Sequence, residues 1–392
     1  MFFLRESFRF PPDLEEALTR ALWQGIPTPQ AIAKRSAGLK SLWPRLAKGR
    51  GIVPEHETHY SFRREEAEAY AAYYLPANAL KVAVVLEEAF LLGQDPLPQE
   101  EAQWLDVGTG PGTAFWGAAW WCAQRSKKFS FHGWDQSPLF SEIAANLTRA
   151  KPFGFTARFQ APAAKGENWE SLLRKNKPTH LSFVNSLAEV YPDFGARKKA
   201  MANALNALRA FSEADGKERF LVLIEPGSRE SSRELAELKD ALQSEGLGRV
   251  LLPCLDARPC GALKEARDWC HEEASCEFPE WVNEVGASVG LRKEALLFSY
   301  VLISATASPS PPRSTGRIVS QRMERKGQVE CRICLPDGKR AARVQRSKAH
   351  AENEFVLECA RGDLWDNVEL EEKGDVKRAT LLRAKSSSVF PK

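Results

Sequence analysis

The sequence predicts an α/β protein in which a parallel sheet is covered by helices on both faces. From Trp104 onward, short apolar, β-rich runs alternate with amphipathic helical stretches, a pattern typical of βαβ units. A glycine-rich loop follows the first of these runs, as in parallel sheets that bind a ligand at the carboxyl ends of their strands. With 392 residues, 43% of them hydrophobic and 27% charged, the chain suits two or three soluble domains.

Residues 1–97 are predicted to form a helical region. In residues 63–92 apolar side chains recur every three or four positions and the acids gather near the start, which indicates helix. We expect Pro76 to separate two helices, because proline breaks the hydrogen-bond ladder. Arg5 and Glu6 interrupt the first apolar residues, and later apolar runs are short and broken by charge. We therefore expect no export signal and no membrane span.

The α/β domain is predicted to occupy residues 98–304. Its expected strands cover residues 104–108, 129–135, 155–160, 179–186 and 219–227. Residues 305–317 are rich in serine and proline and are expected to be a linker. Residues 318–392 are predicted to form a small basic β-domain, with a turn at Pro336–Gly338.

The loop "DVGTGPG" after the first strand is the strongest candidate for a ligand site. Gly108, Gly110 and Gly112 allow a sharp turn and a close approach to a ligand at the start of a helix. Their G-x-G-x-G spacing differs from the dinucleotide fingerprint. Asp106 ends the first strand, and Asp135 ends the next, where an acid can accept the hydroxyls of a ribose. Asn185 and Ser186 at the end of the fourth predicted strand border the same site and are the catalytic candidates.

Four of the eight cysteines lie within residues 254–276, in the spacing C-x5-C-x9-C-x5-C. A reducing compartment makes disulfides unusual, so clustered thiols suggest a metal centre. Cys331 and Cys334 form a further pair in "CRIC", which could be half of a zinc site. The irregular spacing leaves zinc and an iron–sulfur cluster both open.

The segment 301–350 carries eleven lysines and arginines but only three acids. A segment of this charge suits a phosphate backbone, although a solvated strand face would have the same composition. The residues that we expect to contact RNA are Lys339, Arg340, Arg343, Arg346 and Lys348.

Several motifs resemble one family when they are taken together in order. They are "EAEAYAAYYLPAN", "LDVGTGPGTAFW", "LIEPGS", the Pro-Cys-x5-Cys segment before "DWCH", "FSYVLIS", "CLPDG" and "CARGDLWD". From about residue 60 to 368 the chain resembles the methyltransferase-like assembly factors of the small ribosomal subunit, found in mitochondria and bacteria. The resemblance implies a class I methyltransferase fold, S-adenosylmethionine, a 4Fe–4S cluster and association with the small subunit and its ribosomal RNA.

The same resemblance implies which residues hold the cofactors. The cluster ligands would be Cys254, Cys260, Cys270 and Cys334, with Cys276 as the alternative to Cys334. A cluster held by Cys334 would clasp the basic domain onto the α/β domain. Asp106 would hold the amino group of S-adenosylmethionine or orient the loop, and Asp135 would hold its ribose.

The resulting hypothesis is an S-adenosylmethionine-dependent methyltransferase-like protein that acts on small-subunit ribosomal RNA or in assembly of that subunit. The first alternative is an iron–sulfur assembly factor that binds S-adenosylmethionine without turnover. The second is a zinc-bearing methyltransferase of small molecules. We expect a monomer in the cytoplasm, or in the matrix of a mitochondrion.

Overall fold

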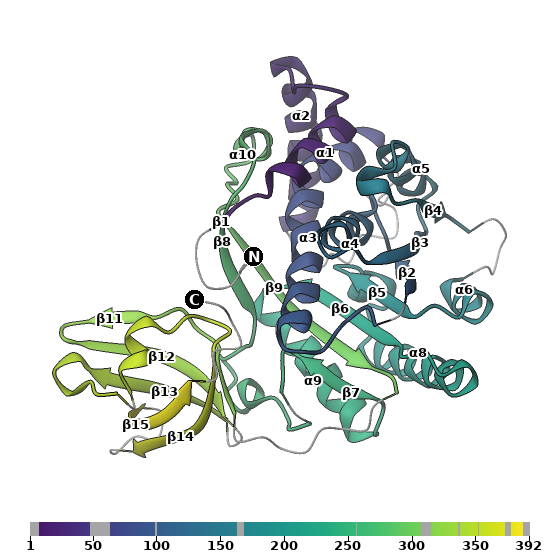
Figure 1. The fold of residues 1–392 in the computed structure, drawn as a ribbon. Helices are drawn as coiled ribbons and strands as arrows, with labels where there is room; N and C mark the ends of the chain where they lie inside the picture. Colours follow the sequence, from purple (N-terminus) through teal and green to yellow (C-terminus); the bar gives the residue numbers. More distant parts are fainter. Residues whose placement is uncertain are drawn as a thin grey trace.

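A computed structural model describes residues 8–47, 63–98, 100–162, 168–255, 257–306, 315–335, 338–351, 353–372 and 378–386. Two sheets organise these residues (Figure 1). The larger has nine strands, in the order β1 (Phe8–Arg9), β8 (Glu272–Glu277), β9 (Ala295–Ser304), β6 (Phe220–Pro226), β5 (His180–Val184), β2 (Glu101–Val107), β3 (Lys128–Trp134) and β4 (Ala157–Gln160), with β7 (Arg249–Leu252) also paired to β9.

The five strands from β6 to β4 run parallel, as the sequence predicts. β5 is buried along its whole length, and β6 is apolar and buried as far as Ile224, because helices cover both faces of a parallel sheet. The strand at residues 295–304 is not among the predicted strands. It runs antiparallel to β6 and pairs on its other side with β7 and β8.

Helices cover the large sheet on both faces and form two separate cores. One face carries α1 (Pro12–Trp23), α2 (Pro29–Ala47), α3 (Arg64–Leu91), α4 (Thr113–Gln124), α5 (Pro138–Thr148) and α10 (Glu280–Ala287). The other carries α6 (Trp169–Asn176), α8 (Phe194–Asp215) and α9 (Arg229–Ser244), while α7 (Leu187–Val190) follows β5. This arrangement confirms the predicted α/β class.

The prediction of two helices separated by Pro76 is wrong. α3 is one helix of 28 residues with Pro76 inside it. Nearly every residue from Ala67 to Ala89 is buried, so packing offsets the roughly 3 kcal/mol that an internal proline costs. At Gly117 of α4, an added Cβ would lie 2.1 Å from the carbonyl oxygen of Ala79. Glycine at this position lets α3 and α4 approach closely. By length and composition α3 could span a membrane, and its apolar stretch is 89% buried here.

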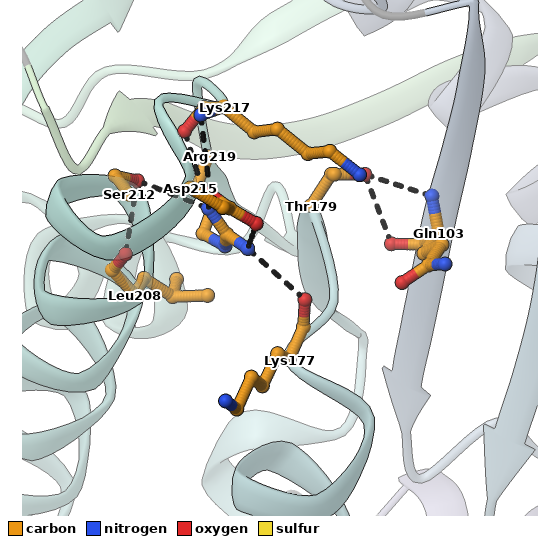
Figure 2. A network of polar contacts seen from close by, with 8 residues as sticks. All are labelled: Gln103, Lys177, Thr179, Leu208, Ser212, Asp215, Lys217 and Arg219. Carbon is orange, nitrogen blue, oxygen red and sulfur yellow. Dashed lines mark hydrogen bonds and ion pairs between the residues drawn. The ribbon is translucent and has the colours of Figure 1, made fainter.

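The edge of the large sheet at the amino ends of β5 and β6 is held by a dense polar network (Figure 2). Arg219 is buried and donates to both carboxylate oxygens of Asp215, at 2.7 and 2.8 Å, and to the carbonyl oxygen of Lys177 at 3.3 Å. The hydroxyl of Thr179 accepts from the backbone N–H of Gln103 and donates to the backbone carbonyl oxygen of Gln103. These bonds join the end of α8 to the starts of β5 and β2, so this edge serves structure.

The smaller sheet closes on itself as a barrel. Its strands are β10 (Gly316–Ile318), β11 (Met323–Arg325), β12 (Gln328–Leu335), β13 (Gly338–Gln345), β14 (Leu364–Glu372) and β15 (Arg378–Ser386). β10 pairs with both β12 and β14, which completes the ring. Its interior holds Ile318, Val329, Ile333, Val344 and Trp365, among others.

The predicted linker and turn are described only in part. β10 begins at Gly316, inside the stretch expected to be a linker, and residues 307–314 lie outside the described part of the chain. Residues 336 and 337 of the predicted turn also lie outside it; β12 and β13 pair on either side of them.

Candidate functional site

The glycine loop lies where the sequence places it, between the end of β2 and the start of α4. Gly108, Gly110 and Gly112 all have positive φ angles, of 67°, 53° and 86°, which residues other than glycine adopt only with strain. A Cβ at Gly108 would lie 2.4 Å from the Cβ of Ser186, whereas a Cβ at Gly110 would meet nothing within 4 Å. Gly108 therefore allows the loop to pack on the end of β5, and Gly110 borders open space.

Asp135 fixes this loop to the end of β3. Its carboxylate accepts from the backbone N–H of Gly110 at 2.8 Å and from that of Ser137 at 2.8 Å. Burial raises the pKa of Asp135 to about 6, and these two hydrogen bonds oppose the shift. Each carboxylate oxygen keeps acceptor capacity, so Asp135 is able to hold the loop and a ribose at once.

Asp106 lies beneath the loop, and its side chain is not among those lining the ligand cavity. It is 1% exposed; one oxygen accepts from Ser182, and the other has no hydrogen-bond partner within the described residues. Burial raises the pKa of Asp106 to about 7, against the hydrogen bond from Ser182. Its position favours orienting the loop over binding an amino group, which were the two predicted roles.

Asn185 and Ser186 both line the cavity, but they differ in how their side chains are hydrogen-bonded. Ser186 donates its hydroxyl to the Val107 carbonyl at 2.6 Å, so it ties β5 to β2. Asn185 has a φ of 56°, a left-handed conformation, and its buried Oδ1 has no partner in the described part of the chain. Unsatisfied buried polar atoms and strained backbone are typical of binding sites. Of the two, Asn185 is the group free to meet a ligand.

Three further residues that no sequence motif indicates also line this cavity. Tyr70 of α3, Phe140 of α5 and Glu189 of α7 line it with the predicted residues. The rings of Tyr70 and Phe140 lie 5.7 Å apart. The cavity holds about 40 Å³, much less than the ~300 Å³ at the lower end for small-molecule sites. A ligand of the size of S-adenosylmethionine therefore needs movement of a bordering side chain.

The residues present nevertheless fit the polar parts of S-adenosylmethionine. A carboxylate at the end of β3, the open space at Gly110 and the unpartnered Oδ1 of Asn185 face one cavity at the carboxyl edge of the sheet, where parallel sheets bind ligands. These groups suit ribose hydroxyls and a polar chain. If bound, the sulfonium would supply an electrophilic methyl group.

A second cavity, of about 50 Å³, is lined by Cys254, Cys260, Cys270 and Cys334. The first three come from the loop that joins β7 to β8. Because both strands pair with β9, this loop leaves the sheet between them and meets β12, which carries Cys334. Burial, followed by the neighbouring thiols, raises the pKa of Cys270, and the pKa of Cys334 rises to about 12 for the same reasons. The four cysteines that the resemblance indicates thus share one space.

The other cysteines lie elsewhere. Cys276 is on β8, pairs with Phe8 and is buried in the core beside α10, so the structure does not bring it into the group. Cys331 is buried inside the barrel, in a hydrogen bond with Cys359, while Cys334 faces outward. Residues three apart on a strand point to opposite faces, so "CRIC" does not act as one chelating pair. Cys122 is buried on α4.

Polar groups surround the four thiols. Lys239 of α9 is 2% exposed; its Nζ lies 3.7 Å from the Sγ of Cys254 and 2.6 Å from Asp240. Asp240 in turn accepts from the backbone N–H of Cys260 at 2.8 Å. Across the described residues, no group of three or more Cys, His, Asp or Glu is arranged to hold a single metal ion.

The barrel is fastened to the large sheet beside these thiols. Arg317 of β10, buried, pairs with Glu88 of α3 and with Glu272 of β8, the latter at 3.0 Å. Tyr300 of β9 donates to the same Glu88. Gly261 packs on the backbone of Gly338, where an added Cβ would come within 2.9 Å. The contact is therefore polar, buried and close.

Of the five basic residues predicted to contact RNA, three are paired with acids. Lys339 binds Asp268 at 2.8 Å and the Trp269 carbonyl, so it belongs to the contact with the cysteine loop. Arg343 pairs with Glu330 at 3.0 Å and Arg346 with Glu324 at 2.8 Å. Lys348 is exposed, and Arg340 is half-buried.

Comparison with known proteins gives a family and distant structural likenesses. Over 157 residues the chain is 26% identical to the human mitochondrial ribosome assembly protein METTL17. The matched region covers 38% of this chain and 32% of that relative, so the chain spans about a third of the length of METTL17. Among solved structures, the N-terminal domain of human METTL16 is 13% identical, covering 76% of this chain and 95% of that one, with a TM-score of 0.35. A methyltransferase from Thiobacillus denitrificans in complex with S-adenosyl-L-homocysteine is 20% identical over 36% of this chain and 48% of that one, with a TM-score of 0.21.

The profile of the family described as mitochondrial small ribosomal subunit Rsm22 matches residues 64–369, from the start of α3 into β14. This range includes the glycine loop, all four thiols of the second cavity and the anchor at Arg317. The chain belongs to the Rsm22 family.

Proposed function

We propose that this protein is a methyltransferase-like factor that acts in assembly of the small ribosomal subunit. The single observation that carries the proposal is the family match across both the ligand cavity and the thiol cavity. The relative METTL17 is named as a ribosome assembly protein, which supports the same role here. The partner would be the immature small subunit with its ribosomal RNA.

S-adenosylmethionine is the proposed ligand of the cavity below Tyr70. Asp135 would accept the ribose hydroxyls, Gly110 would make room, and Asn185 would border the transferred methyl. Methyl transfer from a sulfonium can proceed by positioning alone, so these groups are sufficient for turnover if an acceptor reaches Asn185. Binding without turnover is the second candidate.

A 4Fe–4S cluster is the proposed occupant of the thiol cavity. Four thiols from two parts of the chain line one space of about 50 Å³. A single zinc ion would need all four sulfurs within about 2.3 Å of one point. An iron–sulfur cluster is a larger body, so its four thiolates can lie farther apart. Three ligands would come from the loop after β7 and one from β12. The cluster would then join the barrel to the large sheet.

Anaerobic purification tests the cofactor. We expect iron and acid-labile sulfide in about equal amounts, roughly four of each per chain, with visible absorbance that Cys334→Ser reduces. Cys276→Ser is the matched control and should leave the iron content unchanged. Zinc without sulfide would contradict the cluster.

Labelled S-adenosylmethionine tests the activity. Incubated with immature small subunits, the wild-type protein would transfer label if it is an enzyme, and Asp135→Ala would abolish the transfer. Ribosome binding without label would support the assembly factor that does not turn over. Failure to co-sediment with small subunits or their precursors would contradict both.

A further inference from the structure

The connectivity of the barrel is that of a known nucleic-acid-binding architecture. Around the ring the strands follow the order β10, β12, β13, β15, β14 and back to β10. β13 and β15 are parallel, and every other pair in the barrel is antiparallel. Numbered from one to five along the chain, with β11 as a short extra strand beside β12, the order is 1-2-3-5-4-1. This is the order of the OB-fold, a five-stranded Greek-key barrel that binds oligonucleotides across its second and third strands.

The outer face of β12 and β13 is therefore the surface to examine. Val329, Cys331 and Ile333 point into the barrel, so the alternate residues of β12 point outward. The register places Arg325 of β11 beside Gln328, Glu330 beside Arg343 of β13, and Arg332 beside Ala341. Side chains directly across a ladder share a face, so these residues lie on one outer face, where Arg325 and Arg332 are exposed while Glu330 and Ala341 are buried.

This surface carries cations without partners. Arg325 and Arg332 are exposed and form no ion pair with any residue that the structure describes, and the same holds for Lys326 in the turn after β11. Arg343, which is half-buried, adds a further guanidinium to this face and is paired with Glu330. Neither β11, β12 nor β13 contains an aromatic residue, so the surface offers charge and no platform on which bases could stack.

The other end of the same face is occupied within the molecule. Cys334 and Lys339 lie opposite each other on β12 and β13, and they contact the cysteine loop rather than solvent. β11 lies at the end of the barrel farthest from the large sheet (Figure 1). The free cations therefore extend away from the thiol cavity along one continuous strand face.

We propose that the outer face of β11, β12 and β13 binds a single RNA strand through its phosphates, with Arg325 and Arg332 as the main contacts. This deepens the proposed function, on which the identity of the partner as small-subunit RNA rests. Charge complementarity selects the occupant: RNA presents a regular row of phosphates, which unpaired arginines bind with bidentate geometry. The bound strand would run toward the cysteine loop, since the face ends there.

Charge reversal at the free arginines tests the proposal. The probes are protein-free small-subunit ribosomal RNA and single strands of about 12 nucleotides of poly(U) and poly(A), a length within the range that OB-folds cover. Arg325→Glu with Arg332→Glu should weaken binding to every probe at least tenfold at about 0.1 M salt and reduce the salt slope by about 1.4, at roughly 0.7 per single-strand contact. Poly(U) and poly(A) should bind the wild-type protein with similar affinity.

The matched control is Arg174→Glu with Lys175→Glu, exposed cations on α6 that change the net charge equally. We expect this variant to bind RNA within a factor of two to three of wild type, as expected for loss of long-range attraction alone. Thermal unfolding of both double variants should match wild type, since all four side chains are exposed.

The outcomes separate this proposal from the function on which it rests. Wild-type affinity for RNA in the Arg325/Arg332 variant would overturn the proposed face, even if the protein still binds immature small subunits. An equal loss in the α6 control would also overturn it, because net charge alone would then explain the effect. If the wild-type protein binds the short strands through this face but ignores small subunits, the face stands and the proposed function fails.

Discussion

Two polar regions of this molecule differ in the partners that their buried charged groups meet. At the anchor between barrel and sheet, Arg317 meets two carboxylates, and Glu88 also accepts from Tyr300. At the carboxyl edge of the large sheet, Asp106 and Asn185 each keep a buried oxygen without a partner in the described residues. Arg317 Nε and Glu272 Oε2 at the anchor also have no hydrogen-bond partner in the described residues, but the anchor neutralises its charges by pairing. At the carboxyl edge Asn185 lines a cavity, so a ligand can offset the cost of its unpaired atom, about 1–3 kcal/mol.

The difference suggests how to distinguish the roles of buried charges in this family. A change at the anchor should reduce stability and leave ligand affinity intact. A change at the carboxyl edge should do the opposite. Variants in each region test this contrast.

The largest effect is expected at the anchor. Arg317→Met removes the shared cation and leaves Glu88 and Glu272 facing each other in the interior, which should lower the free energy of unfolding by about 3–5 kcal/mol. Urea denaturation measures this. Arg332→Met, an exposed arginine of the same barrel, should change stability by no more than about 0.5 kcal/mol. Equal stability of the two variants would remove the contrast.

The second effect has the opposite sign. The pKa of Asp106 is about 7 in the folded protein against an ordinary value of 3.8, so the native state keeps a proton that the unfolded chain loses above about pH 4. Stability therefore falls as pH rises from about 4 to 7. Asp106→Asn abolishes this loss and should be about 4 kcal/mol more stable than wild type at pH 8, with little difference near pH 3.

Urea denaturation at the two pH values tests Asp106→Asn. Binding of S-adenosylmethionine, measured by calorimetry, should weaken in the same variant if Asp106 orients the loop. A stability gain of equal size at both pH values would show that Asp106 is charged throughout.

A smaller effect is expected for a methyl group added to the loop. Gly110→Ala puts a Cβ at a φ of 53° without a clash, and should cost about 1 kcal/mol of stability. The methyl projects into the space beside Asp135, so affinity for S-adenosylmethionine should fall at least tenfold. Gly216→Ala, at the end of α8, has a φ of 72° and equally open surroundings. It should show the same stability cost with unchanged affinity, and a loss of affinity there would contradict the assignment of the cavity.

The smallest effect concerns the thiol cavity. The ammonium of Lys239 contacts Cys254, and hydrogen bonds and positive charge near the sulfurs stabilise the reduced form of a cluster. If the thiol cavity holds the proposed cluster, Lys239→Met should lower the reduction potential of that cluster by about 60 mV, the equivalent of one charged hydrogen bond of about 1.4 kcal/mol in a one-electron couple. Spectroelectrochemistry measures the potential, and the iron content should stay at the wild-type level. An unchanged potential would mean that Lys239 acts only in packing.

Local patterns predicted most of the α/β core. The parallel strands β2 to β6 were foreseen because buried parallel strands are apolar runs, and the loop at Gly108 because glycine spacing reflects a backbone requirement. The strand at residues 295–304 was missed, since its antiparallel pairing with β6 is a property of the tertiary fold. The prediction of a helix break at Pro76 failed because burial along α3 outweighed the local preference.

Contacts distant in sequence limited the prediction of the site. Tyr70 and Asn185 line one cavity although more than a hundred residues separate them, and no local pattern reports this. The basic segment was visible as composition, but the register that pairs Arg343 with Glu330 and leaves Arg332 free is fixed by strand pairing. The four cysteines were grouped by a family resemblance rather than by their spacing.

α3 touches both halves of the molecule. Tyr70, near its start, closes the ligand cavity, and Glu88, near its end, holds the barrel through Arg317. Eighteen residues of helix separate Tyr70 from Glu88, which corresponds to about 27 Å along one continuous helix. A tilt of this helix to admit a ligand at one end would move the other end against the barrel, so filling of the cavity and the angle of the barrel become mechanically linked.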